Sequence, residues 1–410
     1  MSLQTAPTIG VSPSARGPGS GPLPPVVILG GEANALSVAR CLGRRGIVVH
    51  VLNRPGAEVR FSRYCHTVYA PDPGRDPEEA WAEFLLGPRA EPLHGAVLLA
   101  CSDAALRLLA THRGTLAERF LLDAMDPVAQ MDMLDKLRTY EHARAAGVPT
   151  PRFWPVDSRE ELLSRCHELV FPLLVKPRLS HVFEARTGLK YRRVEDFDGL
   201  LEAFDAVRAT GSDAVLVEYI PGPDDRLCSY YTYLDEAGRP LLHFTKRVIR
   251  RYPVGMGGGC YHVTDRNPEV AALANALFRG GGLRGLANAE FKRDDRDGGL
   301  KLIECNARFT AANSLVAASG LDLAGFVYDR ILGRLPQPVD SYASELRLWD
   351  PVRDLAAFLQ MRASGQITTR QWLASICHSH TFPYFSWTDP IPSLARICNI
   401  VRKAVSQRVA

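Results

Sequence analysis

The chain has 410 residues, of which 46% are hydrophobic and 23% are charged, with a formal net charge of +4 at pH 7. This is an ordinary balance for a soluble globular protein of two or three domains. No apolar run reaches the ~18 residues that span a bilayer, and no basic block is interleaved with aromatic residues, so we expect neither a transmembrane segment nor a nucleic-acid partner.

The first residues and the cysteines indicate where the protein works. Residues 1–25 are rich in Pro, Gly and Ser and lack the apolar core of a secretory signal, so we expect a flexible leader. The nine cysteines are odd in number, scattered along the chain, and form no C-x-x-C pair. This pattern argues against a disulfide framework or a zinc site and fits a reducing cytoplasm best.

Residues 26–125 alternate between short apolar strands and helices. The predicted strands are residues 25–31, 47–52 and 96–100, and the predicted helices are residues 33–45 and a segment from residue 104. A strand–helix–strand order with short apolar strands implies a parallel sheet covered by helices. We therefore expect a doubly wound N-terminal domain.

The glycine turn after the first strand invites a dinucleotide interpretation, which the sequence does not favour. Gly30 and Gly31 are not spaced as G-x-G-x-x-G, and the second strand ends at Asn53 and Arg54, where a ribose-binding Asp or Glu is needed. We interpret the glycines as a tight turn, and a redox function becomes a distant alternative.

The second part of the chain begins with a predicted helix, residues 134–146, closed by Gly147 and followed by Pro149 and Pro151. The strands expected beyond it are residues 169–175, 214–220, 227–234, 240–248, 286–291 and 300–305, with helices at 194–208 and 270–278. From about residue 337 the pattern loosens into a helical tail.

Two lysines lie at positions where the backbone can aim a cation. Lys136 follows Asp135 at the start of the first of these helices, and Lys176 ends a buried strand in the segment Phe171-Pro-Leu-Leu-Val-Lys-Pro-Arg178. A lysine held in this way can point its ammonium at phosphate oxygens. Taken alone, each lysine fits a surface charge better.

A third segment, Val215-Leu-Val-Glu-Tyr-Ile-Pro-Gly222, is an apolar strand that breaks into a Pro-Gly turn. Such a break exposes backbone N–H and C=O groups that can contact an adenine edge, and the carboxylates of Asp224 and Asp225 follow directly. A strand that merely ends in a turn would have the same sequence pattern, so this segment indicates a nucleotide site only in combination with the other segments.

The fourth segment is the most specific. Glu304, Asn306 and Arg308 alternate along one strand and therefore share a face, while Glu290 on the preceding strand can lie opposite them. Carboxylate and amide oxygens are the ligands that Mg²⁺ prefers. Two acids, an amide and an arginine on one strand face with no ligand would be desolvated without partners, which argues against a purely structural role.

In content, order and spacing, these four segments resemble the ATP-grasp superfamily over residues 26–335. The resemblance is greatest to the carboxylate–amine ligase branch that includes D-aspartate ligase and the large subunit of carbamoyl-phosphate synthase. It implies an α/β ATP-grasp fold with a doubly wound N-terminal (pre-ATP-grasp) domain, a small α+β lid and a C-terminal helical tail. The domains implied are a leader at 1–25, the N-terminal domain at 26–125, the ATP-grasp domain at 126–335 with its lid at about 151–211, and an extension at 336–410.

The resemblance also implies ATP as the nucleotide and a role for each matching residue around it. Lys136 and Lys176 would contact the phosphates. The hinge formed by Glu218, Tyr219 and Ile220 would meet adenine, largely through backbone groups. The ribose would be held by Asp225 or its neighbour, Asp224.

The metal and the reacting groups follow from the same resemblance. Glu290 and Glu304 would bind one Mg²⁺, and Glu304 with Asn306 a second, with Mn²⁺ able to substitute. The residues assigned to the chemistry are Arg308, next to the acceptor carboxylate or acyl phosphate, Arg247, next to the transferred phosphoryl group, and Lys176.

The chain departs from the family in two places. Relatives carry a glycine-rich lid loop after the Val-Lys-Pro strand, whereas residues 178–188 here contain one glycine, so either the lid is stiffer or His181 and Arg186 take over phosphate contacts. Cys305 stands where relatives have a small or β-branched residue, and we interpret it as a packing residue.

The predicted function is the ATP-dependent activation of a carboxylate as an acyl phosphate and its coupling to an amine, with release of ADP and phosphate. The expected substrates are small molecules such as amino acids, or a carrier-bound acyl group, and a homodimer is left open. The main alternative is a phosphotransferase of the same fold. A non-catalytic nucleotide-binding module and a biotin-type carboxylase are less favoured, because the metal-ligand set is complete and a Met-Lys-Met carrier motif is missing.

Two further segments carry weaker predictions. The run Gly255-Met-Gly-Gly-Gly259 is either a substrate loop or a flexible turn. Residues 393–409 form a basic amphipathic helix, which we expect to dock on its own domain rather than on a membrane or a partner.

Overall fold

The computed structural model of the chain describes residues 22–71 and 75–409, with residues 180–182, 185 and 403–409 described by their backbone alone. Most of the predicted leader therefore lies outside the described residues. Its end, residues 22–25, packs against the body of the protein, where the Tyr328 hydroxyl donates a hydrogen bond of 2.6 Å to the carbonyl oxygen of Pro24. No helix of the described chain is both long and apolar enough to cross a membrane.

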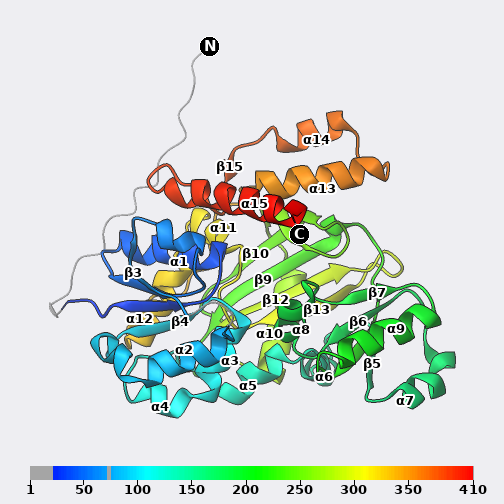
Figure 1. Cartoon of the computed structure of the whole chain (residues 1–410), viewed down its shortest axis with the longest axis horizontal. Coiled ribbons are helices and arrows are strands. Elements are labelled where there is room, and N and C mark those ends of the chain that lie inside the picture. The colour runs from blue at the N-terminus through cyan, green and yellow to red at the C-terminus, as the bar shows by residue number, and fades with distance from the viewer. Residues whose placement is uncertain (1–21, 72–74, 410) are drawn as a thin grey trace.

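Strands and helices alternate through most of the chain (Figure 1). The strands are β1 (Val26–Leu29), β2 (Val49–Leu52), β3 (Cys65–Tyr69), β4 (Val97–Ala100), β5 (Phe153–Val156), β6 (Leu173–Pro177), β7 (Arg192–Val194), β8 (Ala214–Glu218), β9 (Leu227–Leu234), β10 (Phe244–Tyr252), β11 (Gly258–Asp265), β12 (Gly285–Arg293), β13 (Leu300–Asn306), β14 (Arg347–Trp349) and β15 (His380–Thr381). The α-helices are α1 (Ala33–Arg44), α2 (Pro77–Leu86), α3 (Asp103–Thr111), α4 (Arg113–Ala117), α5 (Pro127–Leu134), α6 (Lys136–Ala145), α7 (Arg159–Ser164), α8 (Ser180–Thr187), α9 (Phe197–Arg208), α10 (Pro268–Gly280), α11 (Asn313–Ala318), α12 (Leu323–Ile331), α13 (Pro351–Ala363), α14 (Thr369–Ile376) and α15 (Ile391–Val409). Short 3-10 turns are η1 (Glu58–Phe61), η2 (Pro88–Leu93), η3 (Cys166–Glu168) and η4 (Asp224–Arg226).

The N-terminal sheet is parallel, with the order β3-β2-β1-β4. All four residues of β1 are buried, because helices cover both faces of the sheet. Alternate residues of β1 enter different cores: Val26 and Ile28 pack with α1, and Val27 and Leu29 pack with α3. The doubly wound domain predicted from the sequence is confirmed.

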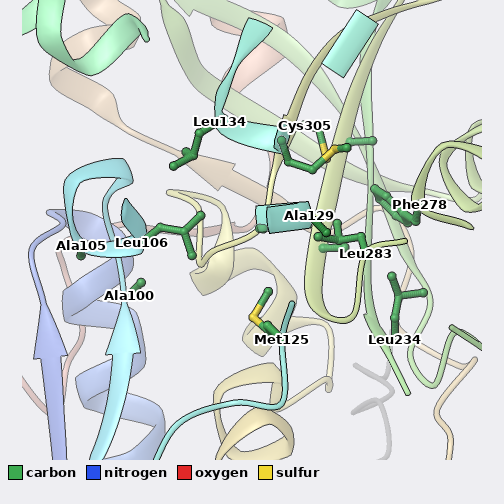
Figure 2. Close-up of a cluster of buried hydrophobic side chains, with 14 of the residues drawn as sticks. Ala100, Ala105, Leu106, Met125, Ala129, Leu134, Leu234, Phe278, Leu283 and Cys305 are labelled. Carbon is green, nitrogen blue, oxygen red and sulfur yellow. The ribbon is translucent and has the colours of Figure 1, made fainter. Parts of the chain in front are cut away.

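The central sheet has seven strands in the order β13-β12-β9-β10-β11-β14-β15, antiparallel except for the last pair. One core joins it to the N-terminal part of the chain. Figure 2 shows Ala100 and Leu106 in the same cluster of apolar side chains as Phe278 and Leu283. The extension expected to be helical also contributes β14 and β15, so it completes the central sheet.

The lid is a further layer, and one face of its sheet packs in a core of its own while Val215 and Val217, on the other face, join the shared core. Its antiparallel sheet has the order β5-β8-β6-β7 and is covered by α7 and α9. Figure 1 shows it at the lower right, beside the central sheet. β8 lies beyond the predicted end of the lid at residue 211, and residues 180–187, expected as part of a loop, form α8. The domain boundaries themselves stay predictions.

Two buried ion pairs attach the C-terminal extension. Arg40 in α1 contacts Asp389 at 2.9 Å, and the Ser62 hydroxyl donates to the same carboxylate at 2.7 Å. Arg250 in β10 contacts Asp354 in α13 at 2.6 Å, with both side chains buried. Removing one partner of such a buried ion pair destabilises the fold, because the remaining charge is left desolvated and unpaired.

We therefore expect Asp354→Ala to lower the free energy of unfolding by about 3–5 kcal/mol, since Arg250 loses its buried partner. The control is Asp205→Ala, which removes an exposed pair with Arg159 at 2.7 Å and is expected to change stability by less than about 1 kcal/mol. Urea unfolding followed by tryptophan fluorescence measures both values. Equal losses of stability in the two variants would contradict the stabilising role given to the buried Arg250–Asp354 pair.

Candidate functional site

A row of charged and polar side chains runs across four strands of the central sheet. Lys246 in β10 pairs with Ser229 in β9, Ser229 pairs with Glu290 in β12, and Glu290 pairs with Glu304 in β13. Directly paired residues share a face of a sheet, so the four side chains face the same way. The Lys246 ammonium accordingly donates to the Ser229 hydroxyl at 3.1 Å.

The next row on this face supplies amides. Asn288 lies opposite Asn306, whose amide nitrogen donates to the Asn288 side-chain oxygen at 3.3 Å. The Asn288 amide in turn donates to the carbonyl oxygen of Tyr230 at 3.0 Å. The predicted metal ligands Glu290, Glu304 and Asn306 are therefore brought together. Both asparagine side chains are buried and anchored, so the amide of Asn306 is held in one orientation.

The opposed carboxylates need positive charge nearby, because like charges facing each other across strands destabilise a sheet. The Lys136 ammonium lies 3.5 Å from the Glu304 carboxylate. Burial alone would raise the pKa of Glu304, but Lys136 and then Lys190 outweigh it and hold that pKa well below its usual range. Burial of Lys246 lowers its pKa, and the nearby Glu290 carboxylate opposes that effect.

Lys176 is buried at the end of β6 and points toward the same region. Its ammonium donates to the Tyr140 hydroxyl at 3.0 Å and lies near the rings of Tyr140 and Tyr191. Burial lowers the pKa of Lys176 to about 8; Glu304 raises it and Arg251 lowers it. Lys176 is thus a desolvated cation within electrostatic reach of the metal-ligand row, as its predicted phosphate role requires.

The hinge after β8 is fixed by its own side chains. The Glu218 carboxylate accepts from the Arg152 backbone N–H at 3.0 Å and from Arg296 at 2.6 Å. Lys292 donates to the carbonyl oxygens of Ile220, at 2.9 Å, and Gly222, at 2.6 Å. The Glu218 side chain therefore shapes the hinge, and the contact of this segment with adenine stays a prediction.

The two aspartates after the hinge differ in environment. Asp224 accepts from Arg251 at 2.6 Å and from the Gly255 backbone N–H at 3.0 Å, whereas Asp225 is exposed. The glycine run is a turn between β10 and β11 that reaches the lid, where the Tyr191 hydroxyl donates to the Met256 carbonyl oxygen at 3.0 Å. Asp225 is thus the more accessible of the two carboxylates proposed for a ribose.

The two predicted arginines lie in different places. Arg308, just after β13, forms an ion pair with Asp103 at the start of α3, and this carboxylate helps to raise the pKa of Arg308 against the opposing effect of burial. Arg308 therefore lies where the central sheet meets the N-terminal sheet. Arg247 follows Lys246 in β10 and alternates to the other face, opposite Cys228. Its register does not favour the predicted contact with a transferred phosphoryl group.

Sequence reasoning missed three cations of the site: Lys246, Lys190 and Arg251. Lys246 could have been found by the alternation rule, had the register of β10 against β12 been known. Lys190 lies in a lid segment with no periodic pattern, and Glu304 with Glu184 raises its pKa against the effect of desolvation. Arg251 stands next to Arg250 near the end of β10, where the sequence pattern gives no signal of a site.

The structure describes both departures from the family pattern, the lid segment at residues 178–188 and Cys305. The lid segment forms α8, and Arg186 donates to the Thr210 carbonyl oxygen at 2.5 Å, which ties this helix to the turn before β8; the side chain of His181 lies outside the described part. Cys305 is buried in the shared apolar core (Figure 2). Burial raises the pKa of its thiol to about 12, so its packing role is confirmed.

The donor set fits a divalent cation that shares its coordination sphere with another ligand. Among the described residues, no group of three or more His, Cys, Asp or Glu side chains forms a site of its own. Glu290, Glu304 and Asn306 supply hard oxygen atoms, which suit Mg²⁺ when phosphate oxygens and water complete the sphere. The site is therefore suited to a metal–nucleotide complex rather than to a metal held by protein alone.

The sequence matches no protein-family model, but it is similar to named ligases. D-aspartate ligase of Enterococcus faecium (strain Aus0004) is 26% identical over 353 residues, which cover 79% of this chain and 81% of that protein. The matched length includes most of the described chain, so the similarity is not confined to one motif.

Two solved structures share the fold. The biotin carboxylase domain of Hydrogenobacter thermophilus 2-oxoglutarate carboxylase, in complex with MgADP, ADP and bicarbonate, superposes with a TM-score of 0.62 at 18% identity and covers 78% of this chain and 73% of its own. L-amino acid ligase from Bacillus licheniformis gives a TM-score of 0.58 at 18% identity, covering 77% and 76%. At this identity the likeness establishes the fold alone.

We expect the affinity for ATP, the nucleotide that the sequence resemblance predicts, to fall as the pH rises through about 8. Lys176 is charged below that pH and loses its proton above it, so its attraction for phosphate is lost by up to about tenfold per pH unit. Lys176→Arg keeps the charge and should flatten the profile. Isothermal titration calorimetry at a series of pH values measures the affinity.

The Lys176→Arg variant also distinguishes the contribution of Lys176 to the pH dependence from that of Lys292. Burial lowers the pKa of Lys292 to about 8 as well, but Lys292 holds the hinge. A pH profile unchanged by Lys176→Arg would assign the effect to another buried lysine, such as Lys292 or Lys246, and contradict the role given to Lys176.

Proposed function

We infer that this chain, which belongs to the carboxylate–amine ligase branch of the ATP-grasp superfamily, uses ATP and Mg²⁺ to activate a carboxylate and join it to an amine. The observation that carries the inference is the row Lys246–Ser229–Glu290–Glu304, with Lys136, Lys176 and Lys190 near it. Such a site offers metal ligands and phosphate-binding cations together. The similarity to D-aspartate ligase over most of both chains supports the ligase assignment.

ATP would lie between the lid and the central sheet. Lys136 and Lys176 supply cations for its phosphates, and the hinge at Glu218, Tyr219 and Ile220 supplies backbone groups for adenine. Asp225, the more exposed of the two aspartates, suits the ribose hydroxyls. Asp224 serves this arrangement indirectly, because it anchors Arg251 and the Gly255 turn near the lid.

Glu290 and Glu304 would hold one Mg²⁺, and Glu304 with Asn306 a second, and Mn²⁺ would substitute for either. The bound metal supplies charge neutralisation on the phosphate oxygens. The protein fixes these ligands in advance: the two carboxylates are set by strand pairing, and Asn306 is set by its hydrogen bond to Asn288. Preorganisation of this kind avoids reorganisation during the reaction.

The reaction proposed is ADP-forming amide synthesis. A carboxylate oxygen attacks the γ-phosphorus in line, ADP leaves, and an acyl phosphate is formed; the amine nitrogen then attacks the acyl carbon, and inorganic phosphate leaves. Lys176 and Lys246 place positive charge on the side from which phosphate is transferred. Arg308 is the cation proposed beside the acyl group and its oxyanion. The lid would exclude water, which would otherwise hydrolyse the acyl phosphate.

The substrate class follows from the relatives as a proposal. Proteins named D-aspartate ligase and L-amino acid ligase act on amino acids by name, so we propose that at least one substrate here is an amino acid or a similar small carboxylate. A carrier-bound acyl group and a homodimeric state remain further proposals. The phosphotransferase alternative is not favoured, because the named relatives are ligases.

We expect ADP release to require both a carboxylate and an amine, and Glu304→Gln to reduce it by about 100-fold or more, because one metal ligand and its charge are lost. A coupled ADP assay over pools of acids and amines measures this. The matched control is Asp205→Asn, which neutralises an exposed carboxylate on the outer face of the lid and should leave the rate unchanged. ADP release with an alcohol and no amine would instead support the phosphotransferase.

We further expect Lys246→Met to lose about 100-fold or more in kcat, while Arg247→Met loses less than about tenfold. The two residues are adjacent in β10, but only Lys246 shares a face with Glu290 and Glu304. Steady-state kinetics and thermal unfolding of both variants check this. A greater loss in kcat for Arg247→Met, with both proteins folded, would restore the assignment made from the sequence.

A further inference from the structure

The last helix docks on the protein through its polar face. In α15 the side chains turned toward the body are Pro392, Ala395, Arg396 and Asn399, spaced as one helical stripe. Asn399 donates to the Gly56 carbonyl oxygen and to Glu58, both at 3.1 Å. The expected docking of this helix is therefore found, but it uses small and polar residues.

The apolar face of α15 points outward. Its residues are between 38 and 60% exposed: Ile391, Leu394, Ile397, Ile400 and Val401. A surface helix normally turns this stripe toward the core and its polar face toward water. The reversed orientation leaves five branched aliphatic side chains in solvent, an arrangement that marks an interaction site rather than a folded interior.

Two exposed aromatic side chains belong to segments next to α15. Trp387 is 89% exposed and Phe61 is 39% exposed. They belong to neighbouring segments, because the Arg63 backbone N–H donates to Asp389 at 2.9 Å and the Arg63 side chain contacts the Thr388 carbonyl oxygen at 3.4 Å. We use the term α15 surface for Phe61, Trp387 and the five outward aliphatic residues of α15.

The charge around the α15 surface is positive. Residues 391–409 contain no Asp or Glu. Arg396 is turned inward and paired with Asp350, but Arg402 is exposed, and exposed Arg60 and Arg63 lie on and beside η1, against which α15 packs. Two copies of the chain meeting through this surface would bring like charges together. An anionic surface would not, and it would also accept the apolar side chains.

We propose that the α15 surface docks on an anionic lipid bilayer. Aliphatic side chains on one helix face, a tryptophan at its end and arginines at its rim are the elements of a helix that lies in the plane of a membrane interface. In Figure 1, α15 lies in the upper part of the molecule, below α13 and α14, and the lid lies at the lower right. A bilayer on α15 would leave the lid free to open and close.

The first test is co-sedimentation of the purified full-length chain with vesicles. We expect binding to mixed phosphatidylcholine–phosphatidylglycerol vesicles and little binding to phosphatidylcholine alone. Leu394→Ser combined with Ile397→Ser should weaken the binding by about tenfold or more, because buried apolar area is lost. The control is Val128→Ser in α5, which removes an aliphatic residue that is 68% exposed, on a helix in the lower part of Figure 1, away from α15.

A second test measures how binding to the bilayer depends on charge and how deeply Trp387 enters the bilayer. Arg60→Gln combined with Arg402→Gln should weaken binding to the mixed vesicles by about tenfold, and added salt should do the same. The fluorescence of Trp387 should shift to the blue on binding, and Trp387→Phe should remove that shift. These variants leave the apolar stripe of α15 intact, so a loss of binding would report the electrostatic attraction and not a change in the fold of the helix.

Two outcomes would overturn the proposal. One is equal binding of the wild type and the Leu394→Ser/Ile397→Ser variant to the mixed vesicles. The other is a dimer in light scattering that the same variant converts to a monomer, which would assign the α15 surface to a second copy of the chain. The activity of the site is not involved in either measurement, so failure of this proposal would leave the proposed function untouched.

Discussion

Two carboxylates face each other across neighbouring strands, and the rest of the site is arranged around their charge. Glu290 and Glu304 are paired directly in β12 and β13, a position where like charges oppose strand pairing. Cations from three other places offset the repulsion: Lys246 in the same sheet, Lys136 in α6 and Lys190 in the lid. A divalent cation between the carboxylates would satisfy them more completely and release the lysines, and phosphate groups are the natural partners for lysines so released. In the proposed function, metal and nucleotide binding would thus be coupled through the same charges.

These cations come from segments far apart in the chain, so the site also ties the layers together. Lys136 begins α6, Lys176 ends β6 of the lid, and Arg308 joins the central sheet to Asp103 of the N-terminal part. One face of the lid sheet packs in an apolar core of its own, while Val215 and Val217 of β8, on the other face, join the core shared with the rest of the protein.

Alternation along a strand made part of this site predictable. Glu304, Asn306 and Arg308 follow a period of two, which needs no knowledge of neighbouring strands, and the doubly wound N-terminal sheet followed from the order of its short apolar segments. Choosing between Lys246 and Arg247 required the register of β10 against β9 and β12, which depends on pairing between distant segments. The side chain of Glu218 could not be assigned either, because its partners Arg152 and Arg296 meet it only in the fold. Lys190 belongs to a lid segment whose position depends on the packing of the whole domain.

The orientation of α15 could not be predicted from its sequence pattern either. Its amphipathic pattern was evident, and a pattern alone implies that the apolar face is buried. The docked face was decided instead by specific polar contacts, those of Asn399 with η1 and of Arg396 with Asp350 at 3.0 Å. Such contacts fix orientation while contributing little by burial, so the apolar face is held outward by the fold. A helix anchored in this way is kept ready for a partner, because no apolar contact within the protein has to be broken before that face can be covered.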